Sequence, residues 1–145
     1  MNDFPDKIAN EEELEELLSR PSAETVELLK RLDGDILFLG IAGKIGPSLA
    51  HMAKRACLEA GVKKRIIGVS RFSNPPEKDL IESWGIETIQ GDLLDRQFLE
   101  NLPKVKNVFF LAGMKFGSED NLALTWAMNS YLPAMVVEYF KDSRI

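Results

Sequence analysis

Three glycines in one short segment suggest the chemistry of this sequence. Gly40, Gly43 and Gly46 are spaced Gly-x-x-Gly-x-x-Gly, after an apolar run at residues 36–39 and before a helical pattern. Glycines permit a tight turn, let a ligand approach the backbone and let a helix pack close to a strand. The free N–H groups at the start of that helix attract an anion such as a pyrophosphate. Tight strand-to-helix turns also serve packing alone, so both interpretations stay open.

The segments around this turn alternate between apolar runs and helical patterns. This alternation predicts a parallel α/β sheet, and the first two strands begin about thirty residues apart, as one βαβ unit requires. The nearly continuous apolar character of the strands predicts that helices cover both faces. We expect His51 and Cys57, on or beside the buried face of the first helix, to be packing residues. The predicted strands are residues 36–39, 65–69, 86–90 and 107–111, and the predicted helices are residues 44–60, 76–84, a short one after Asp95, and 118–140.

Two further helices are predicted before the sheet, at residues 10–20 and 22–32, with Ser22 as the N-cap of the second. The run of five glutamates at residues 11–16 favours a solvated helix face, with a partner-binding surface as the alternative. We expect a helical extension at residues 1–33 that packs on an α/β domain at residues 34–145. The apolar stripes expected to make that contact are Leu14, Leu17 and Leu18 in the first helix and Val26, Leu29 and Leu32 in the second.

Composition excludes several function classes. The 145 residues, 45% apolar and 28% charged, suffice for one ordinary globular domain. A net charge of −5 with scattered basic residues argues against nucleic-acid binding, which needs clustered Lys and Arg. The single Cys57 excludes an internal disulfide, fits a reducing compartment and cannot form a metal site with the lone His51. No apolar run approaches a membrane span and the first residues lack signal-peptide features, so we expect a cytoplasmic protein.

With this context, the glycine turn resembles that of the short-chain dehydrogenase/reductase superfamily, in particular its extended branch of NAD-dependent epimerases and dehydratases. The resemblance extends over about residues 35–145. It implies a partial doubly wound (Rossmann) parallel sheet of four to five strands, in the order 3-2-1-4 with a fifth strand beside the fourth. It also implies a bound dinucleotide. At the turn, the implied cofactor-binding residues are Gly40, Ala42, Gly43, Lys44, Ile45 and Gly46.

The end of the second predicted strand bears on the choice of cofactor. Family members that use NAD usually carry an acidic residue there, which binds the ribose hydroxyls of adenosine. Here Ser70 takes that place and Arg71 follows. Without a carboxylate to repel a 2′-phosphate, and with a fork-shaped donor beside it, the sequence accommodates NADP better than NAD. The alternative is that Arg71 only begins a solvated loop.

The ends of the third and fourth predicted strands also resemble the family. Asp92 and Leu93 resemble its adenine-binding pair, although aspartates here, Asp95 included, also suit turns and helix caps. The small-residue segment Leu111, Ala112 and Gly113 resembles the one that borders the nicotinamide-side ribose. Asn129 resembles the asparagine of the next helix, or it bonds to backbone, and Pro133 should kink or break that helix.

The family's catalytic pair, a tyrosine with a lysine four residues later, is missing. Tyr131 and Tyr139 are followed at that distance by Met135 and Ser143. Residues 141–145 resemble the approach to a fifth strand, so we expect a chain truncated before the Tyr-x-x-x-Lys region, with no catalytic residue and no turnover of its own.

Two hypotheses for function follow. The first is the cofactor half of an NAD(P)-dependent epimerase, dehydratase or reductase that acts on a nucleotide-sugar-like or carbonyl substrate. The second is a non-catalytic module that senses NAD(P), motivated by the missing Tyr-Lys pair. A methyltransferase-like Rossmann domain is a weaker third reading, because it would place an acidic residue where Ser70 stands. Leu122, Trp126, Met135 and Val136 on the last helix suggest apolar surface and a homo-oligomer.

Overall fold

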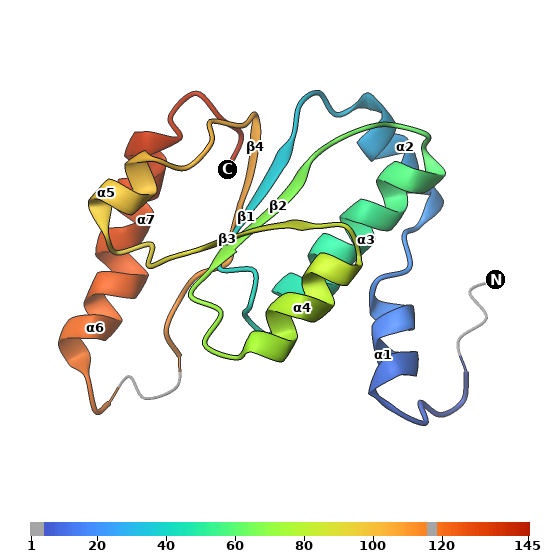
Figure 1. Ribbon diagram of the computed structural model, residues 1–145, viewed down its shortest axis with the longest axis horizontal. Helices are drawn as coiled ribbons and strands as arrows, with labels where there is room; N and C mark the ends of the chain where they lie inside the picture. Colours follow the sequence, from blue (N-terminus) through green and yellow to red (C-terminus); the bar gives the residue numbers. More distant parts are fainter. Residues whose placement is uncertain (1–4, 116–118) are drawn as a thin grey trace.

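A four-stranded parallel sheet lies between two layers of helices in the computed structural model, which describes residues 5–115 and 119–145 (Figure 1). The strand order is β3-β2-β1-β4, so the predicted α/β class and the partial Rossmann-like order 3-2-1-4 are confirmed. The elements are α1 (Glu11–Leu18), α2 (Ala23–Arg31), β1 (Ile36–Leu39), α3 (Gly46–Glu59), β2 (Ile66–Ser70), α4 (Pro75–Ser83), β3 (Glu87–Gln90), α5 (Arg96–Glu100), β4 (Asn107–Phe110), α6 (Leu122–Trp126), the π-helical turn η1 (Ala127–Tyr131) and α7 (Leu132–Tyr139).

The outer edge of β4 pairs with the last residues of the chain through an isolated parallel bridge. Arg144 forms a parallel bridge with Asn107. The Arg144 N–H donates to the Lys106 carbonyl and the Val108 N–H donates to the Arg144 carbonyl, each over 2.8 Å. Arg144 therefore lies beside β4, where the fifth strand was predicted, while the described sheet has four strands.

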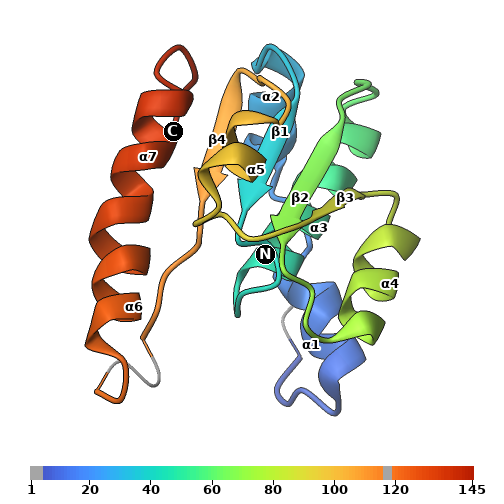
Figure 2. The same ribbon diagram turned by 60° about the vertical axis from the view of Figure 1, so that its left-hand side comes forward.

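Hydrophobic packing fixes each face of the sheet. Alternate residues of β1 point to opposite faces, and all four are buried because β1 is an interior strand with helices packed over both of its faces. Phe38 belongs to the core under α3, where three alanines leave room for the helix to lie close. Leu39 belongs to the core under α7, with Leu132 and Val136. Figure 2 shows these two helical layers on opposite sides of the sheet.

The prediction that both faces of every strand are covered is wrong for β4. Phe109 stacks on Phe38 with ring centroids 4.8 Å apart but remains 40% exposed. On the opposite face, Val108 packs into the core beside α7. The apolar run could not predict that one face of β4 is exposed and the other covered. A run of apolar residues indicates that a strand is buried, but it does not indicate which of its faces a helix covers.

The two N-terminal helices attach to α3 in different ways. In α2, Leu29 is buried and packs in the core under α3 as predicted, and Ser22 is the predicted N-cap. In α1, the leucine stripe was expected to make the contact, but Leu14 and Leu18 are 38% and 50% exposed. That prediction is wrong for Leu14 and Leu18, since α1 contacts α3 through polar side chains, while Leu17 is half-buried.

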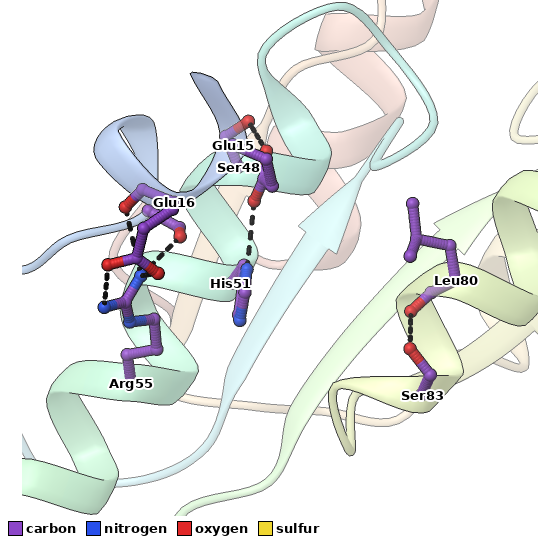
Figure 3. Close-up of polar contacts among 8 residues, drawn as sticks. Glu15, Glu16, Ser48, His51, Arg55, Leu80 and Ser83 are labelled. Carbon is purple, nitrogen blue, oxygen red and sulfur yellow. Dashed lines mark hydrogen bonds and ion pairs between the residues drawn. The ribbon is translucent and has the colours of Figure 1, made fainter. Parts of the chain in front are cut away.

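Those polar contacts involve glutamates that the sequence assigned to a solvated face (Figure 3). Glu15 accepts hydrogen bonds from Ser48 Oγ at 2.5 Å and pairs with His51 Nδ1 at 2.9 Å. The two carboxylate oxygens of Glu16 accept hydrogen bonds from the two terminal nitrogens of Arg55, at 2.8 and 2.9 Å. Ser48, His51 and Arg55 follow one another at three- and four-residue steps, so one polar stripe of α3 meets α1. This stripe is the sequence signal that the leucine pattern obscured.

The last predicted helix is interrupted rather than continuous. Its first predicted residue, Ser118, lies outside the described residues, and α6 begins at Leu122 with Asn121 as its N-cap. The expected disturbance at Pro133 is confirmed as the π-helical turn η1, just before it. Met135 and Val136 are buried, contrary to the expectation of exposed apolar surface, whereas Trp126 is 69% exposed. No helix in the described ranges is both long and apolar enough to cross a membrane.

Candidate functional site

A groove of about 240 Å³ lies at the carboxyl ends of all four strands. In open α/β sheets this edge is where ligands bind, especially where the strand order reverses, here between β1 and β4. Three larger hollows are away from this edge: one of about 410 Å³ between α5 and α7, one of about 770 Å³ beside α1, and one of about 310 Å³ at the opposite ends of the strands, beside Asp35 and Arg65. The groove is lined by Gly40, Ala42, Gly43, Ser70, Arg71, Gly91, Asp92, Leu93, Leu111, Ala112, Gly113 and Met128.

Ten of the fourteen predicted site residues therefore line one groove, although they come from four separate segments. Lys44, Ile45, Gly46 and Asn129 do not line it. Gly91 and Met128 line it without having been predicted. Gly91 precedes the predicted Asp92 directly. Met128 lines the groove because it lies in the π-helical turn, which the helical pattern did not predict.

The glycines of the turn meet different neighbours. Gly40 has a φ of +87°, and a Cβ there would lie 2.7 Å from the Ala112 nitrogen, so it forms a turn pressed against the end of β4. A Cβ on Gly46 would lie 2.0 Å from the Ile41 carbonyl oxygen, so its absence lets α3 begin close to the turn. Gly43 is exposed, with its nearest neighbour, the Gly40 oxygen, at 3.2 Å from such a Cβ. Gly43 is thus the glycine that a ligand can approach.

The start of α3 is not capped by a side chain. Ile45 occupies the N-cap position, where isoleucine offers no acceptor, and no acidic residue stands in the first turn. The Gly43 and Gly46 N–H groups donate within the turn, over 3.1 and 3.2 Å. In the described part of the chain, the N–H groups of Lys44 and Ile45 donate to no backbone carbonyl. They and the helix dipole are free for an anion.

The end of β2 is held by three separate constraints. The Gly91 N–H donates to the Ser70 carbonyl over 3.0 Å, and Gln90 Nε2 donates to the Arg71 carbonyl over 2.8 Å. Phe72 is buried with a φ of +46°, a conformation that costs energy in a residue with a side chain. The Arg71 backbone is therefore fixed while its side chain stays exposed beside the groove. The sequence pattern contained no signal for Gln90 or Phe72.

The two aspartates after β3 have different environments. Asp92 lines the groove, and its Oδ1 also accepts the Leu94 N–H at 3.0 Å to close a short turn. Asp95 is the N-cap of α5, where it accepts the N–H groups of Gln97 and Phe98, as the alternative for that residue predicted. Leu93 lines the groove with the small part of its surface that the core leaves exposed.

Asn129 bonds to backbone, which was the alternative left open for it. Its Oδ1 accepts the Met114 N–H and its Nδ2 donates to the Met114 carbonyl, each over 2.8 Å. Met114 follows Gly113 directly, so this side chain holds the segment that forms one wall of the groove.

The tyrosines do not provide acid–base chemistry in the groove. Tyr139 Oη lies 2.6 Å from the Glu100 carbonyl and 2.9 Å from the Leu102 carbonyl, and burial raises its pKa. It joins α7 to the segment at the end of α5. Tyr131 is exposed on η1. In the described lining, the polar side-chain groups are the hydroxyl of Ser70, the guanidinium of Arg71 and the carboxylate of Asp92. These groups can hold a ligand through hydrogen bonds and ion pairs.

Comparison with known proteins gave no match, either to a protein-family model or to a curated protein.

Proposed function

We propose that this chain binds a dinucleotide cofactor, NADP in preference to NAD, across the carboxyl ends of its strands. The observation that carries the proposal is the uncapped start of α3 beside a glycine turn that opens into the groove. The pyrophosphate would lie at Gly43 and the amides of Lys44 and Ile45. The adenosine would extend toward the ends of β2 and β3, and the nicotinamide toward Ala112 and Gly113.

The cofactor preference rests on the end of β2. Ser70 offers a hydroxyl where a carboxylate would repel a 2′-phosphate, and Arg71 offers a planar set of donors that fits phosphate. The Gly91 N–H and the Gln90 side-chain amide, which donate to the carbonyls of Ser70 and Arg71, hold both residues at the groove. Asp92, on the neighbouring strand end, is then available to accept from the adenine amino group.

The chain would serve as the cofactor-binding part of an NAD(P)-dependent epimerase, dehydratase or reductase of the short-chain dehydrogenase/reductase type. The nucleotide-sugar-like or carbonyl substrate is inferred only from the resemblance at the glycine turn and the strand ends. A second candidate is an NAD(P)-sensing module, favoured by a described lining without a tyrosine, histidine, cysteine or lysine. A sensor must bind oxidised and reduced cofactor with different affinities, so equal affinities for NADP⁺ and NADPH would argue against it.

Calorimetric titration with NADP⁺ and NAD⁺ tests the binding proposal. We expect tighter binding of NADP⁺, and an Arg71→Ala variant should lose about tenfold or more of that affinity, since a hydrogen bond to a charged group is worth about 1.5–3 kcal/mol. Its NAD⁺ affinity should stay within about twofold. Arg31→Ala, on the exposed face of α2, is the matched control. Failure of the folded protein to bind either dinucleotide below millimolar concentrations would refute the proposal, and tighter binding of NAD⁺ would refute the preference.

A further inference from the structure

We infer that Asn129 is a positioning residue of the groove: its amide clamps the Met114 backbone and thereby sets the wall formed by Ala112 and Gly113. The inference rests on the proposed function and assigns Asn129 no contact with the cofactor. Both polar atoms of its side chain are used by one residue, fifteen positions earlier in the chain. The pair satisfies the N–H and the carbonyl of Met114 together, as a neighbouring strand would.

Met114 needs such a partner because the sheet ends before it. The last strand-like bond on this side is the Leu111 N–H to the Leu39 carbonyl, at 2.8 Å. Residues 111–115 form no helix or strand. Beyond Leu111 the amide of Asn129 therefore takes over the role of a partner strand. The Thr125 hydroxyl, 3.7 Å from the Met114 sulfur, adds a contact to the same residue from α6.

The π-helical turn explains why Asn129 stands at the right place. The ring of Pro133 would collide with the carbonyl of the residue four positions earlier in an α-helix, and that residue is Asn129. The helix widens instead, and the Leu132 N–H donates five positions back, to Ala127. Such turns recur at functional sites. Here the widened turn brings Met128 into the groove lining and Asn129 against Met114.

The position of this wall determines the shape of the groove at the glycine turn. Gly40 is pressed so closely on the end of β4 that a Cβ would lie 2.8 Å from the Ala112 Cα. A wall displaced outward would leave Gly40 unsupported, and one displaced inward would collide with it. The clamp at Met114 thus fixes the nicotinamide side of the groove, whereas the ends of β2 and β3 have their own constraints at Ser70 and Arg71.

The test uses Asn129→Asp, which keeps the acceptor for the Met114 N–H and replaces the donor with a second oxygen facing the Met114 carbonyl. We expect about tenfold weaker binding of NADP⁺, because one hydrogen bond is lost and a repulsive contact is added. Adenosine 2′,5′-bisphosphate occupies the ends of β2 and β3 and places its 5′-phosphate at the glycine turn, but it lacks the nicotinamide half that would lie along Ala112 and Gly113. Its binding should therefore change by less than about twofold. Asn129→Ala should act in the same direction, and Ser130→Ala, on the same turn, is the matched control.

Hydrogen exchange measures the clamp without any ligand. In Asn129→Ala the Met114 amide should exchange at least about tenfold faster, since it loses its acceptor, while the Leu111 amide keeps its protection from Leu39. Unchanged exchange at Met114 would overturn the clamp. Unchanged NADP⁺ affinity in Asn129→Asp, or equal losses for NADP⁺ and the bisphosphate, would overturn the positioning role and leave the proposed function intact. Absence of NADP⁺ binding by the unmodified protein would overturn the proposed function and this role with it.

Discussion

Placing the same substitution, glycine to alanine, at Gly43 and at Gly46 should separate ligand binding from folding. At Gly46 the new Cβ would stand 2.0 Å from the Ile41 carbonyl oxygen, and real Cβ atoms essentially never come closer than 3.0 Å. The start of α3 must then move away from the turn by about 1 Å, the difference between these distances. Overpacking of this kind costs about 1–3 kcal/mol, and a rigid backbone neighbour favours the upper value. For a chain of this size we expect Tm to fall by roughly 10 °C.

Gly43→Ala should have the opposite profile. Its Cβ would lie 3.2 Å from the Gly40 oxygen and φ is not positive, so the neighbour need move only slightly. We expect the free energy of unfolding to stay within about 0.5 kcal/mol of the unmodified value. The methyl group would stand where the pyrophosphate approaches the backbone, and loss of one charged hydrogen bond lowers NADP⁺ affinity by about tenfold or more.

Thermal unfolding followed by circular dichroism, and titration calorimetry at a temperature where both variants are folded, measure the two effects. If Gly46→Ala keeps the Tm of the unmodified protein, Gly46 is not needed for the close packing of α3 on the turn. If Gly43→Ala binds NADP⁺ within about twofold of the unmodified affinity, the pyrophosphate does not approach the backbone at Gly43. Gly43→Val extends the series, because a larger side chain at an open position should weaken binding further while the fold remains.

Three other predictions test particular contacts. The Arg55 guanidinium holds the pKa of Glu16 below its usual 4.5, so this pair stabilises α1 docking above that pH and ceases to do so as pH falls through the lowered pKa. Protection of α1 amides, corrected for intrinsic exchange, should therefore decrease in acid, and Arg55→Met should reduce that dependence. Asp95→Ala should cost about 1 kcal/mol in urea unfolding, as loss of an N-cap does, with no change in NADP⁺ affinity. Self-association through exposed Trp126 should appear in light scattering and be lost in Trp126→Glu, and a monomer at high concentration would contradict it.

The elements and their order could be predicted because strand and helix periods are local properties. The predicted strand at residues 36–39 matches β1 exactly in its bounds, and the glycine spacing located the start of α3 within two residues. The strand ends that form the groove followed from parallel topology, which brings Ser70, Asp92 and Ala112 to one edge. These inferences needed no side-chain detail.

What escaped prediction depends on contacts between distant segments. Leu14 and Leu18 form a stripe that stays exposed among the described residues, because α3 presents Ser48, His51 and Arg55 to α1 instead. The period of a helix indicates which of its residues share a face, but it does not indicate which side chains of a neighbouring helix that face will meet. The positive φ of Phe72 and the clamp from Asn129 to Met114 likewise arise only once the segments have met.

The strand order has a consequence for how the chain is made. β1 is an interior strand of the finished sheet, yet β4, its second neighbour, is synthesised only after β2 and β3. Until β4 arrives, one edge of the fully apolar sequence Ile36–Leu39 has unpaired N–H and carbonyl groups. An unpaired apolar edge is a template for pairing with other chains, and parallel sheets close it slowly because their contacts are distant in sequence. We therefore expect the growing polypeptide to pass through a stage at which β1, fully buried in the folded chain, has an apolar edge open to pairing with other chains.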